Sequence, residues 1–406
     1  MKVRNIFYFG HLNIFESSCG VFKLGIFKDR SVLLHDYTPP RLPHRERELK
    51  DLKRHFEPVL REDINVKVHV YGAIGTGKTV LCNRLGEDLE REAEKTGKKL
   101  KYVNINLAYT PKPYHVMSEL MEQVTGSSVG GLSPEQMLMN AAKKISRDGY
   151  KLVLALDEVD TYIKESRDPK IFYMLPRVHE LHRDAARRIS LIYISRSLDW
   201  MKNLDAATLD TLGRTAVVHL EKYRLQEVKD IIAYRASEAF VPGAAPEKTI
   251  DFISYISMNC GGVRYALELL FEAGGLAEME GAEYLKAEYV RRIHASIPKI
   301  TNGAIYPSEL SLHKMLLLKG VINALQTTGD PYIRYDEVYS SYELVCEWRG
   351  REAEDKSTIH SFLTDLSFDG YVIIRKIDSE TYVGMEYPFN RLDKVLEKTL
   401  KEALQH

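Results

Sequence analysis

Apolar residues gather into short runs in the first half of the chain, and stretches of helical periodicity separate these runs. Five runs are apolar enough to form buried strands, at residues 66–71, 100–106, 152–156, 189–195 and 216–220. After the first run, residues 79–95 place Leu81, Leu85 and Leu89 on one face of a helix. Strands that alternate with helices predict an α/β fold, with a parallel sheet between two helical layers and a ligand at the carboxyl ends of the strands.

The strand pattern ends after Leu220, and helical periodicity takes over. Three or four helices are predicted, at 226–240, 246–259, 263–280 and 286–296, and together they would make a small all-helical domain. Residues 298–307 contain Pro298, Gly303 and Pro307 and have the composition of a linker.

The last part of the chain predicts three helices followed by a β-hairpin. The helices span 308–327, 335–348 and 356–368, and the strands span 371–376 and 381–387. This is the order of a winged-helix domain, a fold that contacts DNA in some proteins and other proteins elsewhere. We therefore divide the chain into a sheet domain (1–222, with an N-terminal extension at 1–30), a helical domain (223–300) and a winged-helix domain (308–406).

Composition is that of a soluble globular protein, with 44% hydrophobic and 28% charged residues in 406. The longest apolar runs are far too short to span a bilayer, so no membrane association is expected. Residues 1–15 are aromatic but interrupted by polar residues, which makes a poor signal peptide and favours an extra strand or a mobile arm. Four widely separated cysteines indicate neither a zinc site nor a disulfide framework, so we expect a cytoplasmic protein.

Net charge gives no general affinity for nucleic acid, because Lys+Arg and Asp+Glu both total 57. Any contact with DNA must therefore come from local patches. Residues 308–406 contain 12 Lys/Arg against 17 Asp/Glu, so the predicted winged helix is acidic overall. This balance weakens a DNA-binding role for that domain without excluding it.

The octapeptide from Gly72 to Thr79 fits the phosphate-binding pattern G-x-x-x-x-G-K-[ST] and directly follows the first predicted strand. Its glycines let backbone N–H groups surround the β-phosphate, Lys78 reaches the β- and γ-phosphate oxygens, and the Thr79 hydroxyl ligates Mg²⁺. ATP or ADP with Mg²⁺ is the expected ligand. The predicted nucleotide-binding residues of this segment are Gly72, Ala73, Gly75, Thr76, Gly77, Lys78, Thr79 and Val80.

A pair of acidic residues follows the third predicted strand. Asp157 is expected to hold the Mg²⁺ together with Thr79, and Glu158 to orient or activate the attacking water. Two motifs of this kind, each at the end of a strand, predict a nucleoside-triphosphate-binding protein.

Further segments resemble the archaeal origin-recognition family, the Orc/Cdc-type AAA+ replication initiators. In chain order they are Pro43-His44-Arg45, the octapeptide, Leu156 to Asp160, Glu221-Lys222-Tyr223 and Gly261 to Leu267. They cover residues 30 to about 300 in the family's order, and the predicted winged helix lies where the family has one. The resemblance implies an AAA+ fold with a five-stranded parallel sheet, an all-helical lid and a C-terminal winged-helix domain.

The resemblance also implies roles for individual residues. Arg264 would project from the start of a lid helix onto the γ-phosphate and so report whether that phosphate is present. By sequence alone it would be read as an exposed arginine at a helix start, and Tyr223 as a packing residue. The residues expected on the adenine and lid sides of the nucleotide are Pro43, His44, Arg45, Tyr223 and Arg235.

Two positions depart from the family pattern. Arg196 follows Ser195 where the family usually has an asparagine, and it would either touch the γ-phosphate or point to solvent. Ala207 stands where the family places an arginine that completes a neighbouring subunit's site, and the nearby Arg214 is out of register. Hydrolysis is therefore expected to be slow, with the nucleotide acting mainly as a switch.

Two elements are expected to contact DNA in this family: an insertion at about 107–131 and the winged helix. Cationic and polar side chains suit phosphate and base contacts, although a solvated surface explains them equally well. The candidates are Lys112 and Tyr114 in the insertion and Lys356, Ser357, Thr358, His360, Ser361, Thr364, Arg375 and Lys376 in the winged helix.

Three functions remain open from the sequence. The first is an ATP/ADP-switched initiator that recognises double-stranded origin DNA, is monomeric in solution or assembles on DNA, and is associated with the nucleoid. A paralogous initiator and the replicative helicase would be its protein partners. The second is a ring-forming motor or helicase loader, and the third is a nucleotide-dependent adaptor whose acidic winged helix binds protein.

Overall fold

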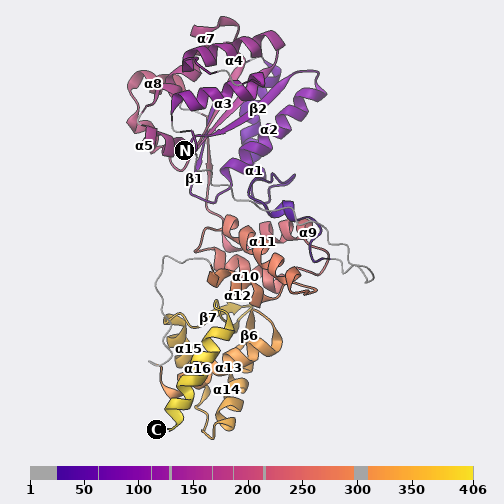
Figure 1. Cartoon of the computed structure of the whole chain (residues 1–406), viewed down its shortest axis with the longest axis vertical. Coiled ribbons are helices and arrows are strands. Elements are labelled where there is room, and N and C mark those ends of the chain that lie inside the picture. The colour runs from indigo at the N-terminus through magenta and orange to yellow at the C-terminus, as the bar shows by residue number, and fades with distance from the viewer. Residues whose placement is uncertain are drawn as a thin grey trace.

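Three domains follow one another along the length of the molecule in the computed structural model, with the sheet domain at one end and the winged helix at the other (Figure 1). The structure describes residues 25–62, 64–110, 112–127, 130–166, 168–185, 187–213, 216–296 and 310–405. Residues 1–15, the linker at 298–307 and Arg214 lie outside these ranges, so the expectations for these residues stay predictions. Among the described residues, no helix combines the length and the apolar character needed to cross a bilayer.

The sheet domain is built on five parallel strands in the order β2-β3-β4-β1-β5. They are β1 (Lys67–Gly72), β2 (Leu100–Asn106), β3 (Lys151–Asp157), β4 (Ile189–Ser195) and β5 (Val217–Leu220). The predicted α/β fold is confirmed, and each strand begins and ends within one residue of its apolar run. Every residue of the central strand β4 is buried, because helices cover both faces of the sheet.

Alternate residues of each strand pack on opposite helical layers. Val153 and Ala155 of β3 face α1 (Glu46–Arg61) and α2 (Lys78–Lys95), whereas Leu152 and Leu154 face α3 (Pro113–Thr125) and α4 (Pro134–Asp148). Shorter elements complete the second layer. They are α5 (Val159–Ser166), α6 (Lys170–Met174), η2 (Leu175–Arg177), α7 (Val178–Leu181), η3 (Arg183–Ala185), η4 (Asp199–Asn203) and α8 (Ala206–Leu212).

The helical domain contains the four predicted helices: α9 (Leu225–Ala239), α10 (Glu247–Ser257), α11 (Val263–Met279) and α12 (Ala287–Ser296). Its core also takes in a segment from the other end of the sequence, around η1 (Arg30–Leu33). Ile26, Val32 and Leu33 are buried against the lid helices, and the Phe27 ring stacks 4.5 Å from that of Phe240. The described part of the predicted N-terminal extension therefore packs on the lid rather than on the sheet.

The winged-helix domain contains the predicted three helices and hairpin, with one additional strand and one additional helix. Its elements are α13 (Leu312–Thr328), β6 (Tyr332–Arg334), α14 (Tyr335–Trp348), α15 (Lys356–Phe368), β7 (Ile373–Ile377), β8 (Glu380–Gly384) and α16 (Phe389–Gln405). The antiparallel strands are ordered β6-β8-β7. Asp378 and Ser379 both have positive φ, as the tight two-residue turn between β7 and β8 requires.

The lid and the winged helix are joined through buried arginines. Arg291 of α12 is fully buried and donates from Nε to the Met385 carbonyl at 2.8 Å and from Nη2 to the Pro331 carbonyl at 3.1 Å. Its guanidinium also lies over the rings of Phe252 and Phe389. Burial lowers the pKa of Arg291 to about 10, which leaves it charged at neutral pH. This packing couples the lid to the winged-helix domain.

Candidate nucleotide site

The phosphate-binding octapeptide forms the turn between β1 and α2. Lys78 is buried, and its Nζ donates to the carbonyls of Gly72 (2.8 Å) and Ala73 (2.9 Å). The ammonium is thus held in the middle of the loop, where it can exchange these carbonyls for phosphate oxygens. Burial lowers its pKa, while the carboxylates of Glu158 and Asp157 act in the opposite direction.

The two predicted magnesium ligands lie side by side. The Thr79 hydroxyl, in the first turn of α2, donates to Asp157 Oδ2 at the end of β3 over 2.6 Å. A hydroxyl and a carboxylate are oxygen ligands of the kind Mg²⁺ prefers, so the residues present fit this ion. Burial raises the pKa of Asp157, and the hydrogen bond from Thr79 opposes this rise. Val80 occupies the same first turn of α2.

The lid closes over the loop at Gly75. A Cβ atom on this residue would lie 2.9 Å from the Gly261 carbonyl, and φ at Gly75 is +79°. Glycine fits this position because it has no Cβ and readily adopts a positive φ. Because Gly261 lies two residues before α11, the contact brings the start of that helix near the phosphate-binding loop, and Arg264 is exposed in its first turn.

Glu158 begins a network of charged side chains beside Asp157. Arg196, at the end of β4, places Nη2 3.2 Å from Glu158 Oε2 and Nε 3.8 Å from Asp160 Oδ2. The Thr161 hydroxyl also donates to Glu158 Oε2, over 3.1 Å. About half of the Arg196 side chain is exposed, and contact with a γ-phosphate stays a prediction. Sequence reasoning missed Asp160 as a partner, although it lies within the segment that carries the family resemblance.

Arg45 and Tyr223 brace the loop from the other side. The Arg45 guanidinium donates to the carbonyls of Thr76 (3.2 Å) and Glu221 (2.5 Å) and lies 4.0 Å from the centre of the Tyr223 ring. The Tyr223 hydroxyl approaches Gly77 so closely that a Cβ there would be only 3.1 Å away. Burial raises the pKa of Tyr223 to about 12, so this hydroxyl keeps its proton.

His44 and Arg45 border a cavity of about 460 Å³ between α1 and the edge strand β5. His44 lines it, and its Nε2 lies 2.8 Å from Asp230 Oδ2 on α9, which links the entry segment to the lid. Pro43 is half-buried next to it in the chain. These contacts place the entry motif between the sheet domain and the lid.

Arg235 contacts the N-terminal segment of the chain. Its buried guanidinium donates from Nε to the Val32 carbonyl over 2.8 Å and packs over the Tyr37 ring. Burial lowers its pKa. The contacts of Arg235 are therefore with the N-terminal segment on the lid, and a position close to the nucleotide stays a prediction.

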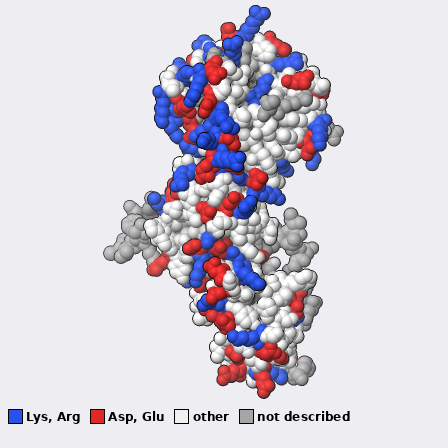
Figure 2. Space-filling view, turned by 180° about the vertical axis from the view of Figure 1, so that it is seen from behind, with Lys and Arg blue, Asp and Glu red and all other residues white. Residues whose placement is uncertain are grey.

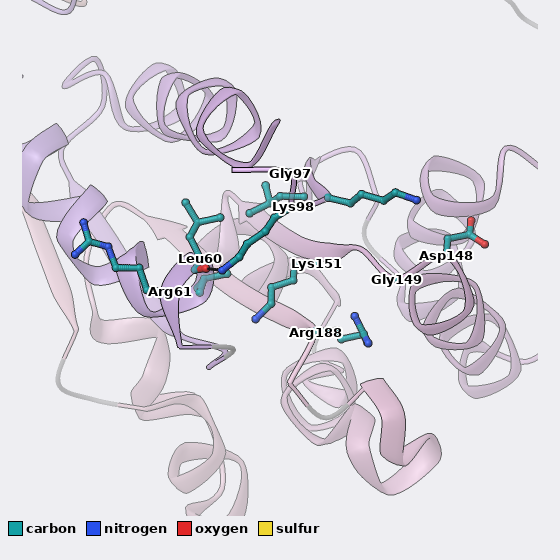
Figure 3. Close-up of a pocket in the computed structure, with 11 residues that line it drawn as sticks. Leu60, Arg61, Gly97, Lys98, Asp148, Gly149, Lys151 and Arg188 are labelled. Carbon is teal, nitrogen blue, oxygen red and sulfur yellow. Dashed lines mark hydrogen bonds between the residues drawn. The ribbon is translucent and has the colours of Figure 1, made fainter. Parts of the chain in front are cut away.

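A second cavity, of about 470 Å³, lies at the other end of the strands, near their first residues. Lys151 and Arg188 lie between the Leu60 end of α1 and the Asp148 end of α4 (Figure 3). These residues precede or begin β3 and β4, whereas the phosphate-binding loop follows the carboxyl end of β1. Because the strands are parallel, this cationic cavity is separate from the nucleotide site, and no predicted site residue lines it.

The candidate DNA-contacting residues separate into exposed and buried sets. On α15, Ser357, His360, Ser361 and Thr364 are exposed at helical spacing on one face. Thr358 is half-buried, and its backbone N–H and hydroxyl donate to the carboxylate of Asp355, which caps the same helix. In the insertion, Lys112 and Tyr114 are exposed at the start of α3.

Two of the three winged-helix cations that were expected to contact DNA form ion pairs within the protein. Lys356 Nζ lies 2.9 Å from Asp336 Oδ1, and 60% of its side chain is exposed. Lys376 is exposed, but Arg375 is only 12% exposed, forms an ion pair with Asp251 of the lid and packs against Tyr255. Neighbouring residues of a strand point to opposite faces, so only Lys376 can face outward. The structure therefore engages Arg375 with the lid, and contact between Arg375 and DNA stays a prediction that these contacts do not favour.

Charge is unevenly distributed over the surface. On the face shown in Figure 2, Lys and Arg gather on the sheet domain, whereas Asp and Glu are prominent at the tip of the winged helix. This agrees with the acidic balance of residues 308–406.

Comparison with known proteins identifies all three domains. Family models match residues 68–197 (AAA domain), 229–295 (Cdc6 AAA+ ATPase-type lid domain) and 307–386 (CDC6, C-terminal winged helix domain). The chain is 30% identical to an ORC1-type DNA replication protein of Pyrococcus abyssi over 88% of its own length and 85% of the relative.

Solved structures agree with this assignment. Cdc6p from Pyrobaculum aerophilum superimposes with a TM-score of 0.76 at 26% identity, covering 94% of this chain and 100% of that protein. The Aeropyrum pernix ORC1 protein, solved in complex with DNA, gives a TM-score of 0.59 at 28% identity and covers 93% of this chain and 97% of that protein. With its AAA+ sheet domain, helical lid and winged helix, the chain belongs to the Cdc6/ORC1-type family of DNA replication initiators.

Proposed function

We propose that this protein is an ATP/ADP-switched initiator that binds double-stranded origin DNA and hydrolyses ATP slowly, with Mg²⁺ as its metal ion. The observation that carries the nucleotide part is the meeting of Thr79, Asp157 and Lys78 beneath a lid whose Gly261 touches Gly75. When bound, Mg²⁺ would neutralise phosphate charge, with Thr79 and Asp157 as its protein ligands. Lys78 would hold the phosphates, and Glu158 would accept a proton from the attacking water.

The DNA part is supported by the exposed polar face of α15. In winged-helix and related domains, the side chains of one helix reach base edges while cations hold phosphates. His360 and Thr364 are exposed on this face, Lys356 is an exposed cation at the start of the same helix, and Lys376 is exposed on β7. The DNA complex of the Aeropyrum pernix ORC1 protein supports the same role here.

The buried packing between lid and winged helix supports coupling of the two activities. Arg264, at the start of α11, would sense the γ-phosphate, and a change in lid position would reach α15 through Arg291 and Arg375. A paralogous initiator and the replicative helicase are the protein partners that this role implies, and the chain would act in the cytoplasm on the nucleoid.

Fluorescence anisotropy tests the proposal, with origin and scrambled duplexes titrated over a salt series in ATP and in ADP. Lys356→Ala should weaken binding to every duplex and lower the salt slope by about 1, because one phosphate contact is lost. His360→Ala should instead change the ranking among sequences. Lys202→Ala is a matched control, since it is an exposed lysine paired with an aspartate, Asp199, on the sheet domain.

The outcomes separate the alternatives. Equal affinity for all duplexes in ATP and ADP would contradict the switch, and no duplex affinity at low salt would favour a protein adaptor. A stable ring in ATP with turnover above about 1 per second would favour a motor or loader, because intrinsic hydrolysis without an arginine finger is about 10⁻⁴ to 10⁻² per second.

A further inference from the structure

Cationic side chains gather around the cavity at the first residues of the strands, away from the nucleotide site. Of the described residues that line it, five are Lys or Arg and one is acidic. They come from four parts of the sheet domain: the end of α1, the turn between α2 and β2, the start of β3 and the approach to β4. The cations are Arg61, Lys98, Lys99, Lys151 and Arg188.

Helix ends account for part of this positive charge. The helices α1, α2 and α4 all end at the cavity, and the last turn of a helix carries about half a negative charge. Lys98 serves one of these ends, because its Nζ donates to the carbonyl of Leu60 in the last turn of α1. Together the three helix ends offset about one and a half positive charges.

Carboxylates offset little of the remainder. Asp148, the acidic residue of the described lining, is already held by two cations outside that lining. Its Oδ2 lies 2.7 Å from Lys144 Nζ, and its Oδ1 lies 3.2 Å from Arg147 Nε. Within the part of the chain that the structure describes, Lys99 and Arg188 form no ion pair with a carboxylate.

The cavity therefore keeps a positive excess. Arg61 points away from the other labelled cations in Figure 3, so it is the least able to act in the cavity. The charges of Lys98, Lys99 and Arg188 alone exceed what the helix ends offset by about one to two units. Like charges held close together repel one another, and an anion bound between them would remove that repulsion.

The shape of the cavity favours a small anion over a duplex. Its volume of about 470 Å³ lies in the range of small-molecule sites. A duplex carries its phosphates on the outside of a rod, which cannot enter such a space. The candidate DNA-contacting residues of the sheet domain, Lys112 and Tyr114, follow the carboxyl end of β2, at the other end of the strands.

We propose that this cavity binds a small anion with two or three linked phosphate groups, at a site separate from the phosphate-binding loop. Arg188 would hold two phosphate oxygens at once, because its planar guanidinium matches their geometry. Lys99 would contact a neighbouring phosphate, and Lys98 has donors beyond the one that the Leu60 carbonyl receives. The phosphate chain of a nucleotide and an inorganic polyphosphate share this chemistry. The inference goes beyond the proposed function and does not depend on it.

Calorimetric titration with inorganic tripolyphosphate tests the site in two full-length chains. One is the parent saturated with ADP, and the other is Lys78→Ala, in which the phosphate-binding loop has lost its ammonium. One tripolyphosphate should bind per chain in both, more tightly than pyrophosphate and far more tightly than phosphate. Titration of ATP into Lys78→Ala separates the two sources: tighter binding than tripolyphosphate identifies a nucleotide, and equal or weaker binding identifies a polyphosphate chain.

Single substitutions locate the anion. Arg188→Ala should weaken tripolyphosphate about tenfold, because a bidentate charged contact is lost, and Arg188→Lys should restore part of the affinity. Arg187→Ala is the matched control, since Arg187 is the exposed neighbour in the chain and does not line the cavity. It should change the affinity by less than about twofold, because salt screens an exposed charge outside the site.

A second measurement does not depend on substituting Arg188. Bound tripolyphosphate should slow the acetylation of Lys98 and Lys99, measured by mass spectrometry of peptides, and leave that of Lys202 unchanged. If circular dichroism shows that Arg188→Ala is unfolded, Lys99→Ala replaces it, because Lys99 is exposed, and it should weaken tripolyphosphate several-fold.

Four results would overturn the inference. The first is no saturable binding at millimolar tripolyphosphate, and the second is an equal loss in Arg187→Ala and Arg188→Ala, which would indicate general surface charge. The third is binding that both ADP and Lys78→Ala abolish, which would place the anion in the phosphate-binding loop. The fourth is displacement of tripolyphosphate by a short duplex whose own affinity falls in Arg188→Ala, which would make the cavity a DNA contact.

Discussion

The nucleotide site and the lid–winged-helix interface use cationic side chains in opposite ways. At the nucleotide site, Lys78 contacts carbonyls of its own loop, which a phosphate can replace, and about half of the Arg196 side chain is exposed. At the interface, Arg291 and Arg375 are buried, and several fixed groups share each guanidinium. The contrast shows that the partners of a cation, more than its charge, determine whether it binds ligand or joins domains.

Lys78→Ala should have the largest effect on this contrast. Removing the ammonium takes away the charge at the centre of the phosphate-binding loop, so nucleotide should no longer be retained through purification. The folded chain should survive, because Lys78 contacts only carbonyls of its own loop. The nucleotide released on denaturation is measured by chromatography, and circular dichroism checks that the variant is folded. Unchanged content would contradict the site.

Arg291→Met should reduce the free energy of unfolding by about 2–4 kcal/mol, because two buried carbonyls lose their donor and the guanidinium loses its aromatic contacts. Urea unfolding of the full chain measures this loss. Arg292→Met is the neighbouring control: its exposed pair with Glu280 should contribute about 0–1 kcal/mol. Similar losses in both variants would show that burial of Arg291 does not hold the domains together.

The two cations of β7 should separate stability from DNA contact, with the smallest effects of the series. Arg375→Ala leaves Asp251 with the more distant Lys229, at 3.8 Å, and should cost about 2 kcal/mol of stability while leaving the salt slope unchanged. Lys376→Ala should change stability by less than about 0.5 kcal/mol and lower the salt slope by about 1. Anisotropy and urea unfolding on both variants make the comparison, and a reversed pattern would overturn it.

Local sequence was sufficient where local contacts decide the structure. Each strand of the sheet follows from an apolar run, and the phosphate-binding loop follows from glycines whose carbonyls and N–H groups make the site. Helix α16 could also have been predicted, because Leu392, Leu396 and Leu400 recur at helical spacing and are buried. Strand β6 has only three residues and carries no periodic signal of its own.

Contacts between distant segments could not be predicted in the same way. Arg375 looked like a surface cation on a hairpin, but its partner, Asp251, is 124 residues away on the lid. Arg235 looked like a nucleotide-facing arginine, but it donates a hydrogen bond to the carbonyl of Val32, which is 203 residues away in the sequence. Arg196 departs from the family pattern, so only its observed neighbours, Glu158 and Asp160, suggest a role for it.

The position of residues 25–33 on the lid has a consequence for synthesis of the chain. The segment leaves the ribosome before the sheet domain, yet Ile26, Val32 and Leu33 belong to a core whose other members begin with Val228. At roughly 5–20 residues per second, about 200 residues take about 10 to 40 seconds to follow. During that interval the sheet domain can complete its own core, while the lid residues that pack on these apolar side chains have not yet been synthesised. The lid core is therefore completed after the sheet domain, and residues 25–33, which are translated before that domain, are buried after it.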